Sequence, residues 1–166
     1  MKQETRAALE EAKSQLEQKE ATKIAEKEAA KKAEEKEIAD KKARKAALKE
    51  PILKELIDFK GVLPHELKST YDGFKPFYTK TEEIKGGLAR RVVGTKTEEY
   101  YLAITSSANI IILVKTTDEK GKKSSKEIQI EKIDELDIVV LETLTIEKIE
   151  EFEDLFNLNK HTYIYQ

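Results

Sequence analysis

The sequence contains no cysteine, which excludes disulfide bonds and thiolate metal sites and is typical of a protein from a reducing compartment. No apolar run approaches the roughly 20 residues that a helix needs to cross a bilayer. The first residues lead into a charged segment, where a secretory signal would have an apolar stretch. We therefore expect a soluble, cytoplasmic protein.

Patterns typical of catalysis or metal binding are also missing. The two histidines, His65 and His161, lie about a hundred positions apart, and neither has the spacing of a metal ligand. The serine pairs at 106–107 and 124–125 have no Gly-x-Ser-x-Gly context. We expect no enzymatic activity, no cofactor and no metal site.

The hydrophobic residues are unevenly distributed along the chain. Most Ile, Phe and Tyr residues follow Pro51, whereas residues 1–50 are mostly Lys, Glu and Ala. We therefore predict a charged helical arm over residues 1–50 and an α+β domain over residues 51–166. The net charge of -2, with Glu interleaved among the lysines of the arm, disfavours nucleic acid as a partner.

Residues 2–49 contain neither Gly nor Pro and are rich in strong helix formers, so this segment is predicted to form one long helix. Pro51 is predicted to kink or end it, because proline removes a backbone donor and crowds the preceding turn. A second short helix is then expected as far as Phe59, with Gly61 as its C-terminal cap.

Leu9 and Leu16 are seven residues apart and Ile24 and Ile38 are fourteen apart, but Leu16 and Ile24 are eight apart, so the heptad register slips. Three interpretations remain open for the arm. It is a single solvated helix, a coiled coil that forms a homodimer, or a helix that docks on a helix of a partner.

The densest apolar sequence is predicted to form an antiparallel hairpin, with strands at 99–105 and 110–114 joined by a turn at 106–109. Gly86-Gly87 predicts another hairpin turn. A further strand is expected at 126–130. Seven residues are predicted to include the most buried members of the core: Leu102, Ile104, Ile111, Leu113, Ile128, Ile130 and Phe152.

Towards the C-terminus the apolar run 137–141 is interpreted as another strand. Thr145 is the expected N-cap of a C-terminal helix, and Leu144 is placed to pack against Ile149. The helix is expected to close near residues 157–159, before a final short strand at 162–165.

The segments 101–105, 110–114 and 128–138 together resemble the core of bacterial pleckstrin-homology-like domains. The resemblance covers roughly residues 64–160 and implies a curved sheet closed by a C-terminal helix. It departs from the family pattern at 106–109, where the family usually has a basic residue, which leaves another helix-capped β fold open.

Four aromatics around Gly73 and Pro76 are more than one short segment easily buries, which makes them candidates for binding a protein partner. They are Tyr71, Phe74, Phe77 and Tyr78. The alternative is that they cover the open end of the sheet. Three cations near Gly86-Gly87 are candidate anion ligands for a headgroup-binding domain: Lys85, Arg90 and Arg91.

These features favour a protein-interaction module, in which the arm self-associates or docks on a helix and the second domain recognises a protein partner. A cellular scaffold fits this interpretation as well as an accessory or inhibitor protein of a mobile element does. The alternative, suggested by the resemblance, is a module that binds anionic lipid headgroups at a membrane surface.

Overall fold

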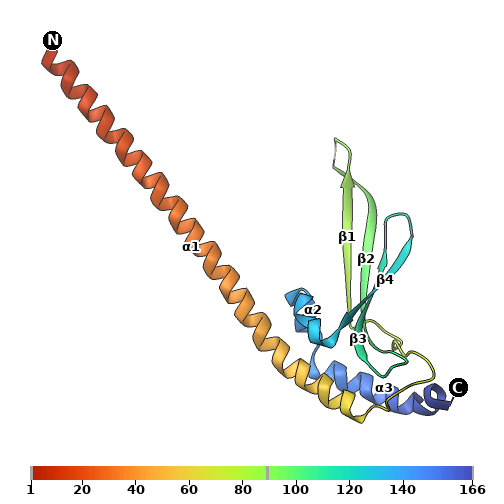
Figure 1. Ribbon diagram of the computed structural model, residues 1–166. Coiled ribbons are helices and arrows are strands. Elements are labelled where there is room, and N and C mark those ends of the chain that lie inside the picture. Colours follow the sequence, from red (N-terminus) through yellow and green to blue (C-terminus); the bar gives the residue numbers. More distant parts are fainter. Residues whose placement is uncertain (1, 89, 166) are drawn as a thin grey trace. The chain divides into compact units, whose positions relative to one another are not determined.

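The computed structural model describes residues 2–88 and 90–165, with side chains for residues 8–88 and 90–160. Its elements are, in chain order, α1 (Lys2–Val62), β1 (Tyr78–Gly86), β2 (Arg91–Ile104), β3 (Ile110–Thr117), β4 (Lys123–Gln129), η1 (Ile130–Glu135), α2 (Ile138–Thr143) and α3 (Ile146–Tyr165) (Figure 1). This confirms an α+β protein with a long N-terminal helix, an antiparallel sheet and C-terminal helices.

The chain divides into two compact units, unit 1 (Met1–Ala43) and unit 2 (Arg44–Gln166). The boundary predicted at residue 50 stays a prediction. None of the helices within the described residues combines the length and apolarity that crossing a membrane requires.

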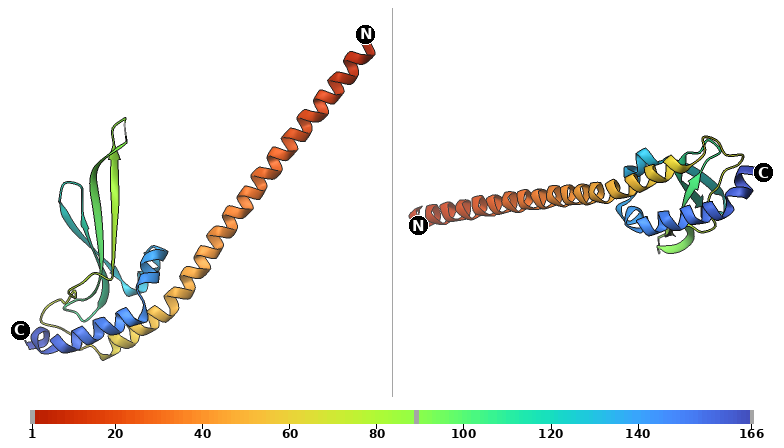
Figure 2. Two further views of the ribbon diagram at one scale, coloured as in Figure 1. Left: turned by 180° about the vertical axis from the view of Figure 1, so that it is seen from behind. Right: turned by 90° about the horizontal axis from the view of Figure 1, so that it is seen from below.

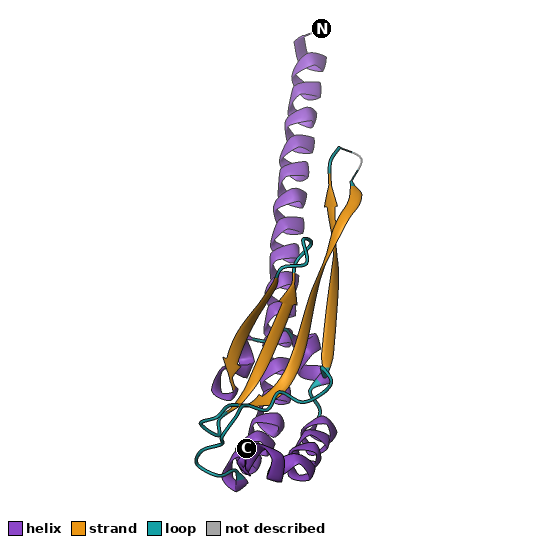
Figure 3. Ribbon diagram, turned by 90° about the vertical axis from the view of Figure 1, so that its right-hand side faces the viewer, coloured by secondary structure: helices purple, strands orange, loops and turns teal. Residues whose placement is uncertain are grey.

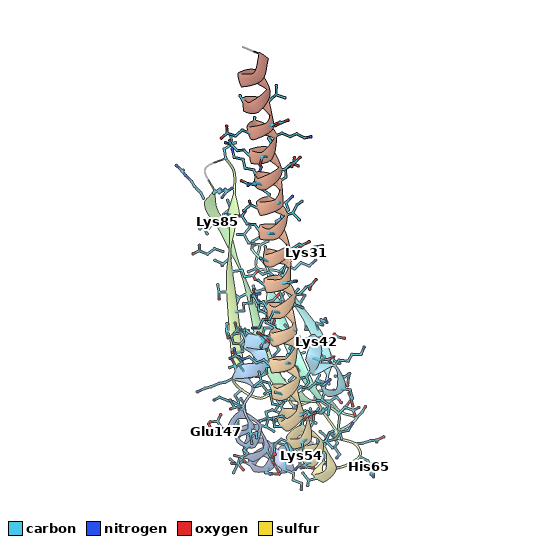
Figure 4. All side chains as sticks on the ribbon, turned by 90° about the vertical axis from the view of Figure 1, so that its left-hand side faces the viewer. Lys31, Lys42, Lys54, His65, Lys85 and Glu147 are labelled. Carbon is cyan, nitrogen blue, oxygen red and sulfur yellow. The ribbon has the colours of Figure 1, made fainter. Side chains whose placement is uncertain are left out.

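Unit 1 consists of the first part of α1, which confirms the helix predicted over residues 2–49. All its described side chains, from residue 8 to residue 43, are exposed. They project outwards from the helix, and Figure 4 labels Lys31 and Lys42 among them. Lys41 pairs with Glu37 one turn earlier, over 2.6 Å, an arrangement that supports an exposed helix.

The predicted end of the helix at Pro51 is wrong, because α1 continues through this residue to Val62. The kink that was the other expectation stays a prediction. Proline inside a helix costs about 3 kcal/mol or more. Immediately after it, however, Ile52, Leu56 and Phe59 are all buried in the core of unit 2. This packing holds the segment helical. Gly61 lies inside the helix without a left-handed φ and is not the predicted cap.

Unit 2 contains a four-stranded antiparallel sheet in the order β1-β2-β3-β4. Its centre confirms the predicted hairpin, since Ile104 pairs with Ile110 across the turn at 106–109. The turn at Gly86-Gly87 and the strand before Ile130 are also confirmed, as the β1–β2 connection and β4. Figure 3 shows the helices of unit 2 grouped near one end of the strands, opposite to the tip of the β1–β2 hairpin.

The strand predicted at 137–141 is wrong, because this segment forms the short helix α2. The adjacent residues Val140 and Leu141 are both buried, and Leu144 is buried one helical turn later, whereas Val139 is exposed. A strand would instead point Val140 and Leu141 to opposite faces. Two ion pairs join this region to the part of α1 that belongs to unit 2: Arg44 with Glu142, and Lys49 with Asp134 over 3.4 Å.

The helix α3 begins as predicted after Thr145, whose Oγ1 accepts a hydrogen bond from the backbone N–H of Lys148 over 3.4 Å. Leu144 and Ile149 are both buried, as the predicted hydrophobic contact requires. The strand predicted at 162–165 is wrong, because α3 continues to Tyr165. No Gly or Pro interrupts the sequence from Ile146 onward, so nothing ends the helix earlier.

The core of unit 2 lies between one face of the sheet and the three helices α1, α2 and α3. In Figures 1 and 2, α3 runs alongside the last turns of α1, and the Phe59 ring lies 6.1 Å from that of Phe152 and 6.2 Å from that of Phe156. Six of the seven predicted core residues are buried. Leu113 is half-buried and pairs with Tyr101; it lies on the face of β3 away from the core, together with the buried Ile111.

Replacing Pro51 by alanine should stabilise unit 2, because the backbone N–H of residue 51 could then donate within α1 and the proline ring would no longer crowd the preceding turn. We expect the free energy of unfolding to rise by roughly 1 to 3 kcal/mol. Urea denaturation followed by circular dichroism measures this. Lower stability for Pro51→Ala would mean that the helix needs proline at this position.

Candidate binding groove

A groove of about 580 Å³ lies between α3 and the loop that precedes β1. Its lining is mainly apolar and comes from the loop, β2, the connection between α2 and α3, and α3 itself: Gly73, Phe74, Lys75, Pro76, Phe77, Leu102, Leu144, Lys148, Glu151, Phe152, Asp154, Leu155 and Leu158. A volume of this size is typical of sites that hold a small ligand or an anchoring peptide side chain.

The loop that forms one wall of the groove is attached to the sheet at both of its ends. Tyr71 and Ile104 exchange two backbone hydrogen bonds, of 2.8 and 2.6 Å. At the other end, the backbone N–H of Phe77 donates to the carbonyl of Tyr100 over 2.9 Å. The chain turns between these points at Gly73, whose φ is +65°. A wall fixed in this way is preformed, which lowers the entropic cost of binding.

The other wall is one side of α3. Phe152 and Phe156 point into the core, whereas Leu155 and Leu158 are 37% and 79% exposed. Lys148 and Leu155 line the groove at helical spacing together with Leu158, so this side of α3 forms a second stripe beside the buried one. The stripe provides apolar surface that nothing within the described residues of unit 2 covers.

The rim of the groove carries balanced charges. Lys148 and Glu151 form an ion pair of 3.1 Å with each other. Lys75 and Asp154, by contrast, form no ion pair among the described residues. The groove therefore presents one unpaired cation and one unpaired anion beside its apolar floor, and its charge does not favour a strongly anionic ligand.

The structure distributes the four predicted partner-binding aromatics over different environments. Phe74 is 70% exposed and lines the groove, together with half-buried Phe77. Tyr71 is only 2% exposed and lies in the core, with its ring centre 5.2 Å from that of Phe152. Tyr78 is half-buried against Tyr100, at 5.6 Å, and does not line the groove. Only Phe74 and Phe77 thus lie where a ligand in the groove would touch them.

Sequence reasoning missed the α3 wall of the groove. Its signal was the recurrence of Lys148, Glu151, Leu155 and Leu158 at intervals of three or four residues. Because the helix was expected to close near residues 157–159, Leu158 fell outside the predicted helical face.

The three candidate anion ligands lie at the tip of the β1–β2 hairpin, and Figure 4 labels Lys85 there. All three are exposed, and none forms an ion pair within the described part of the chain. Lys85 pairs with Val92 and Gly86 with Arg91, so the side chains of Lys85 and Arg91 leave opposite faces of the ribbon. The cations are therefore close together along the hairpin, but their side chains do not converge on a common anion.

A polar cluster lies on β2, the strand that also contributes Leu102 to the groove. The hydroxyl of Tyr100 donates to Glu98 over 3.0 Å, and Lys96 donates to the same carboxylate over 2.6 Å. Burial, followed by the hydrogen bond to Glu98, raises the pKa of Tyr100 to about 12. The hydrogen bond from Lys96 holds the pKa of Glu98 below its usual value. Glu98 therefore stays ionised and Tyr100 neutral over the physiological range.

No cluster of three or more histidine or acidic residues suited to a metal ion occurs among the residues that the structure describes. No family model, curated protein or solved structure matches the chain. The resemblance to pleckstrin-homology-like domains therefore stays a prediction, and the function has to be argued from the geometry.

Gly73→Ala should destabilise unit 2 more than Gly121→Ala does. Both glycines have a left-handed φ, which costs an L-residue about 1 to 2 kcal/mol. At Gly73 a Cβ would also lie 3.3 Å from the ring of Phe152, whereas nothing lies within 4 Å at Gly121. We expect losses of roughly 2 to 4 kcal/mol and 1 to 2 kcal/mol, respectively, in urea denaturation. Equal losses would show that the loop yields to the added methyl group.

The stability of the protein should fall at alkaline pH partly through Tyr100. Because its pKa in the folded state, about 12, lies above that of an ordinary tyrosine, the folded state holds the proton more tightly. This stabilisation is complete below about pH 10 and is lost as the pH rises towards 12. Unfolding free energies measured between these limits should therefore fall less steeply for Tyr100→Phe, and identical slopes would contradict the assignment.

Proposed function

We propose that this protein is a non-enzymatic protein-interaction module and that its groove in unit 2 binds an apolar segment of a protein partner. The observation that carries the proposal is the exposure of Phe74 beside Leu155 and Leu158, on two walls of one preformed groove. Exposed apolar side chains gathered in this way mark interaction sites more often than scattered ones do.

The chemistry of the groove indicates the kind of segment that it takes. Its apolar lining suits two or three aliphatic or aromatic side chains presented by a short amphipathic helix or turn. The charges of Lys75 and Asp154 at the rim suit an acidic and a basic residue of the same segment. Both a scaffold and an accessory or inhibitor protein that acts by steric binding would use such a site.

The alternative function, binding of anionic lipid headgroups, is favoured by a different surface. At the β1–β2 tip, Leu88, Val92 and Val93 are highly exposed beside the basic residues Arg90 and Arg91. Apolar side chains flanked by cations suit an anionic membrane surface. The divergence of Lys85 and Arg91, however, provides no headgroup pocket, and for this reason we place the main function in the groove.

Selection from a displayed library of random peptides tests the groove. Peptides that bind the full chain should carry apolar anchors, and their affinity should fall about tenfold or more on Phe74→Ser and on Leu158→Ser, because buried apolar anchors dominate such interfaces. The matched control is Val139→Ser on α2, an exposed apolar residue outside the groove, which should leave the affinity unchanged.

Circular dichroism melting verifies that each variant remains folded. Selected peptides that bind Phe74→Ser as tightly as the unmodified chain would contradict the groove as the site. The alternative function predicts that the chain binds phosphatidylserine vesicles and that charge reversal at Arg90 and Arg91 abolishes this binding. That result would favour the alternative.

A further inference from the structure

We infer that two copies of this chain pair antiparallel through unit 1, an interaction independent of the groove. The described part of unit 1 carries four large apolar side chains, which we call the apolar stripe: Leu9, Leu16, Ile24 and Ile38. They are 73%, 61%, 58% and 59% exposed, respectively. At about 100° per residue, all four lie within about 80° of the helix circumference. Four exposed apolar side chains along one line of a helix indicate a helical partner.

The slipped register of the stripe agrees with a straight helix. The longer step between Leu16 and Ile24 offsets the shorter steps on either side, so the stripe recurs on average about every 3.6 residues. A strict heptad would require a left-handed supercoil, whereas this stripe stays on one side of a straight α-helix. Two such helices can therefore pair along the whole stripe.

Charged residues occur along the same line between the apolar ones, and their order selects the orientation. They are Lys13, Glu20, Lys27, Lys31 and Glu34. In a parallel pair in register, each of them would face its own copy. The interface between the two helices would then contain five contacts between like charges, which disfavours the parallel arrangement.

An antiparallel pair centred on Ile24 brings apolar side chains together. The Ile24 residues of the two copies then meet at the two-fold axis, and Leu9 of each copy lies opposite Ile38 of the other. Leu16 faces Lys31, whose methylene stem can cover an apolar neighbour while its ammonium group stays in water. Every contact away from the axis occurs twice by symmetry.

The same register pairs opposite charges. Lys13 lies opposite Glu34 of the second copy, and Glu20 lies opposite Lys27. A shift of about two helical turns would instead place Glu20 opposite itself and Lys13 opposite Lys27, or Lys27 opposite itself and Glu20 opposite Glu34. A shift of about one helical turn in either direction would place Ile24 and Ile38 opposite charged residues, so the apolar contacts disfavour it. Charge complementarity and apolar contacts together therefore select one orientation and one register, with a second copy of the chain as the partner.

Charge exchange between Glu20 and Lys27 tests the pairing in the full chain. Light scattering after size exclusion should give a concentration-dependent mass that approaches twice the chain's 19.0 kDa. Glu20→Lys alone and Lys27→Glu alone each place two like-charge contacts at the seam and should weaken dimerisation roughly tenfold. The double variant restores opposite charges only in the antiparallel register, so its dissociation constant should return to within about threefold of the original.

The matched control exchanges Glu11 and Lys36, which lie on the far face of the helix, outside the pairing surface, and should leave the dissociation constant unchanged. Circular dichroism confirms equal helicity. A monomer mass at all concentrations would overturn the inference, as would a double variant as weak as either single variant. The peptide-binding experiment on the groove uses variants of unit 2 alone. Absence of dimerisation would therefore contradict this inference without contradicting the proposed function.

A cross-linking experiment measures the orientation directly, since the chain has no other cysteine. Leu9→Cys and Ile38→Cys, mixed and oxidised, should form a disulfide between unlike chains, whereas each variant alone should form little. The two positions are about 44 Å apart along one helix, too far for like residues to meet in an antiparallel pair. Efficient cross-linking of either variant with itself would indicate a parallel pair and overturn the inference.

Discussion

The contact of Tyr71 with the sheet and with α3 is the interaction on which unit 2 depends. The backbone of Tyr71 forms two hydrogen bonds with Ile104, and its ring packs 5.2 Å from Phe152 and 6.0 Å from Phe156. Phe59 joins these two rings from α1. One aromatic cluster thus connects α1, the loop, the sheet and α3, segments that are distant in sequence. Edge-on and tilted ring contacts of this kind contribute about 0.5 to 1.5 kcal/mol beyond the burial of their area.

The groove is a consequence of this cluster. Because Phe152 and Phe156 turn one side of α3 towards the core, the adjacent side with Leu155 and Leu158 faces outwards. The backbone of Tyr71 fixes the loop in front of that side, so Phe74 is held as the opposite wall. The same residues that stabilise the fold therefore determine the width of the groove. This is why changes at Tyr71 should alter stability, whereas changes at Phe74 should alter binding.

The parts of the fold that were predictable from the sequence are those in which local pattern and tertiary packing agree. The hairpin from Tyr101 to Val114 and the start of α3 at Thr145 are examples, since the residue types, the turn and the cap all favour the same element. At Pro51 the local penalty is opposed by the burial of three apolar residues just beyond it, and this burial depends on partners far away in the sequence. In α2, the β-branched residues favour a strand locally, but the helical spacing of the buried residues decides.

The candidate groove was only partly predictable for the same reason. The cluster of aromatics around Gly73 correctly drew attention to the loop, but composition does not separate Tyr71, which is buried, from Phe74, which is exposed. That difference follows from the pairing of Tyr71 with Ile104, a contact between residues distant in the chain. The second wall required the full length of α3, because Leu158 belongs to it only when the helix continues beyond residue 157.

The two proposed interfaces have different physical characters, and this difference constrains how they work together. The groove is compact and preformed, so a single short segment can fill it. The apolar stripe is long and interrupted by charges, so its affinity should be modest and sensitive to salt. A weak dimer of this kind would carry two grooves. A partner with two copies of its apolar segment would then bind far more tightly than one with a single copy, because the second contact becomes intramolecular. Dimerisation through unit 1 would in this way set the avidity of recognition by unit 2, without any change in the groove itself.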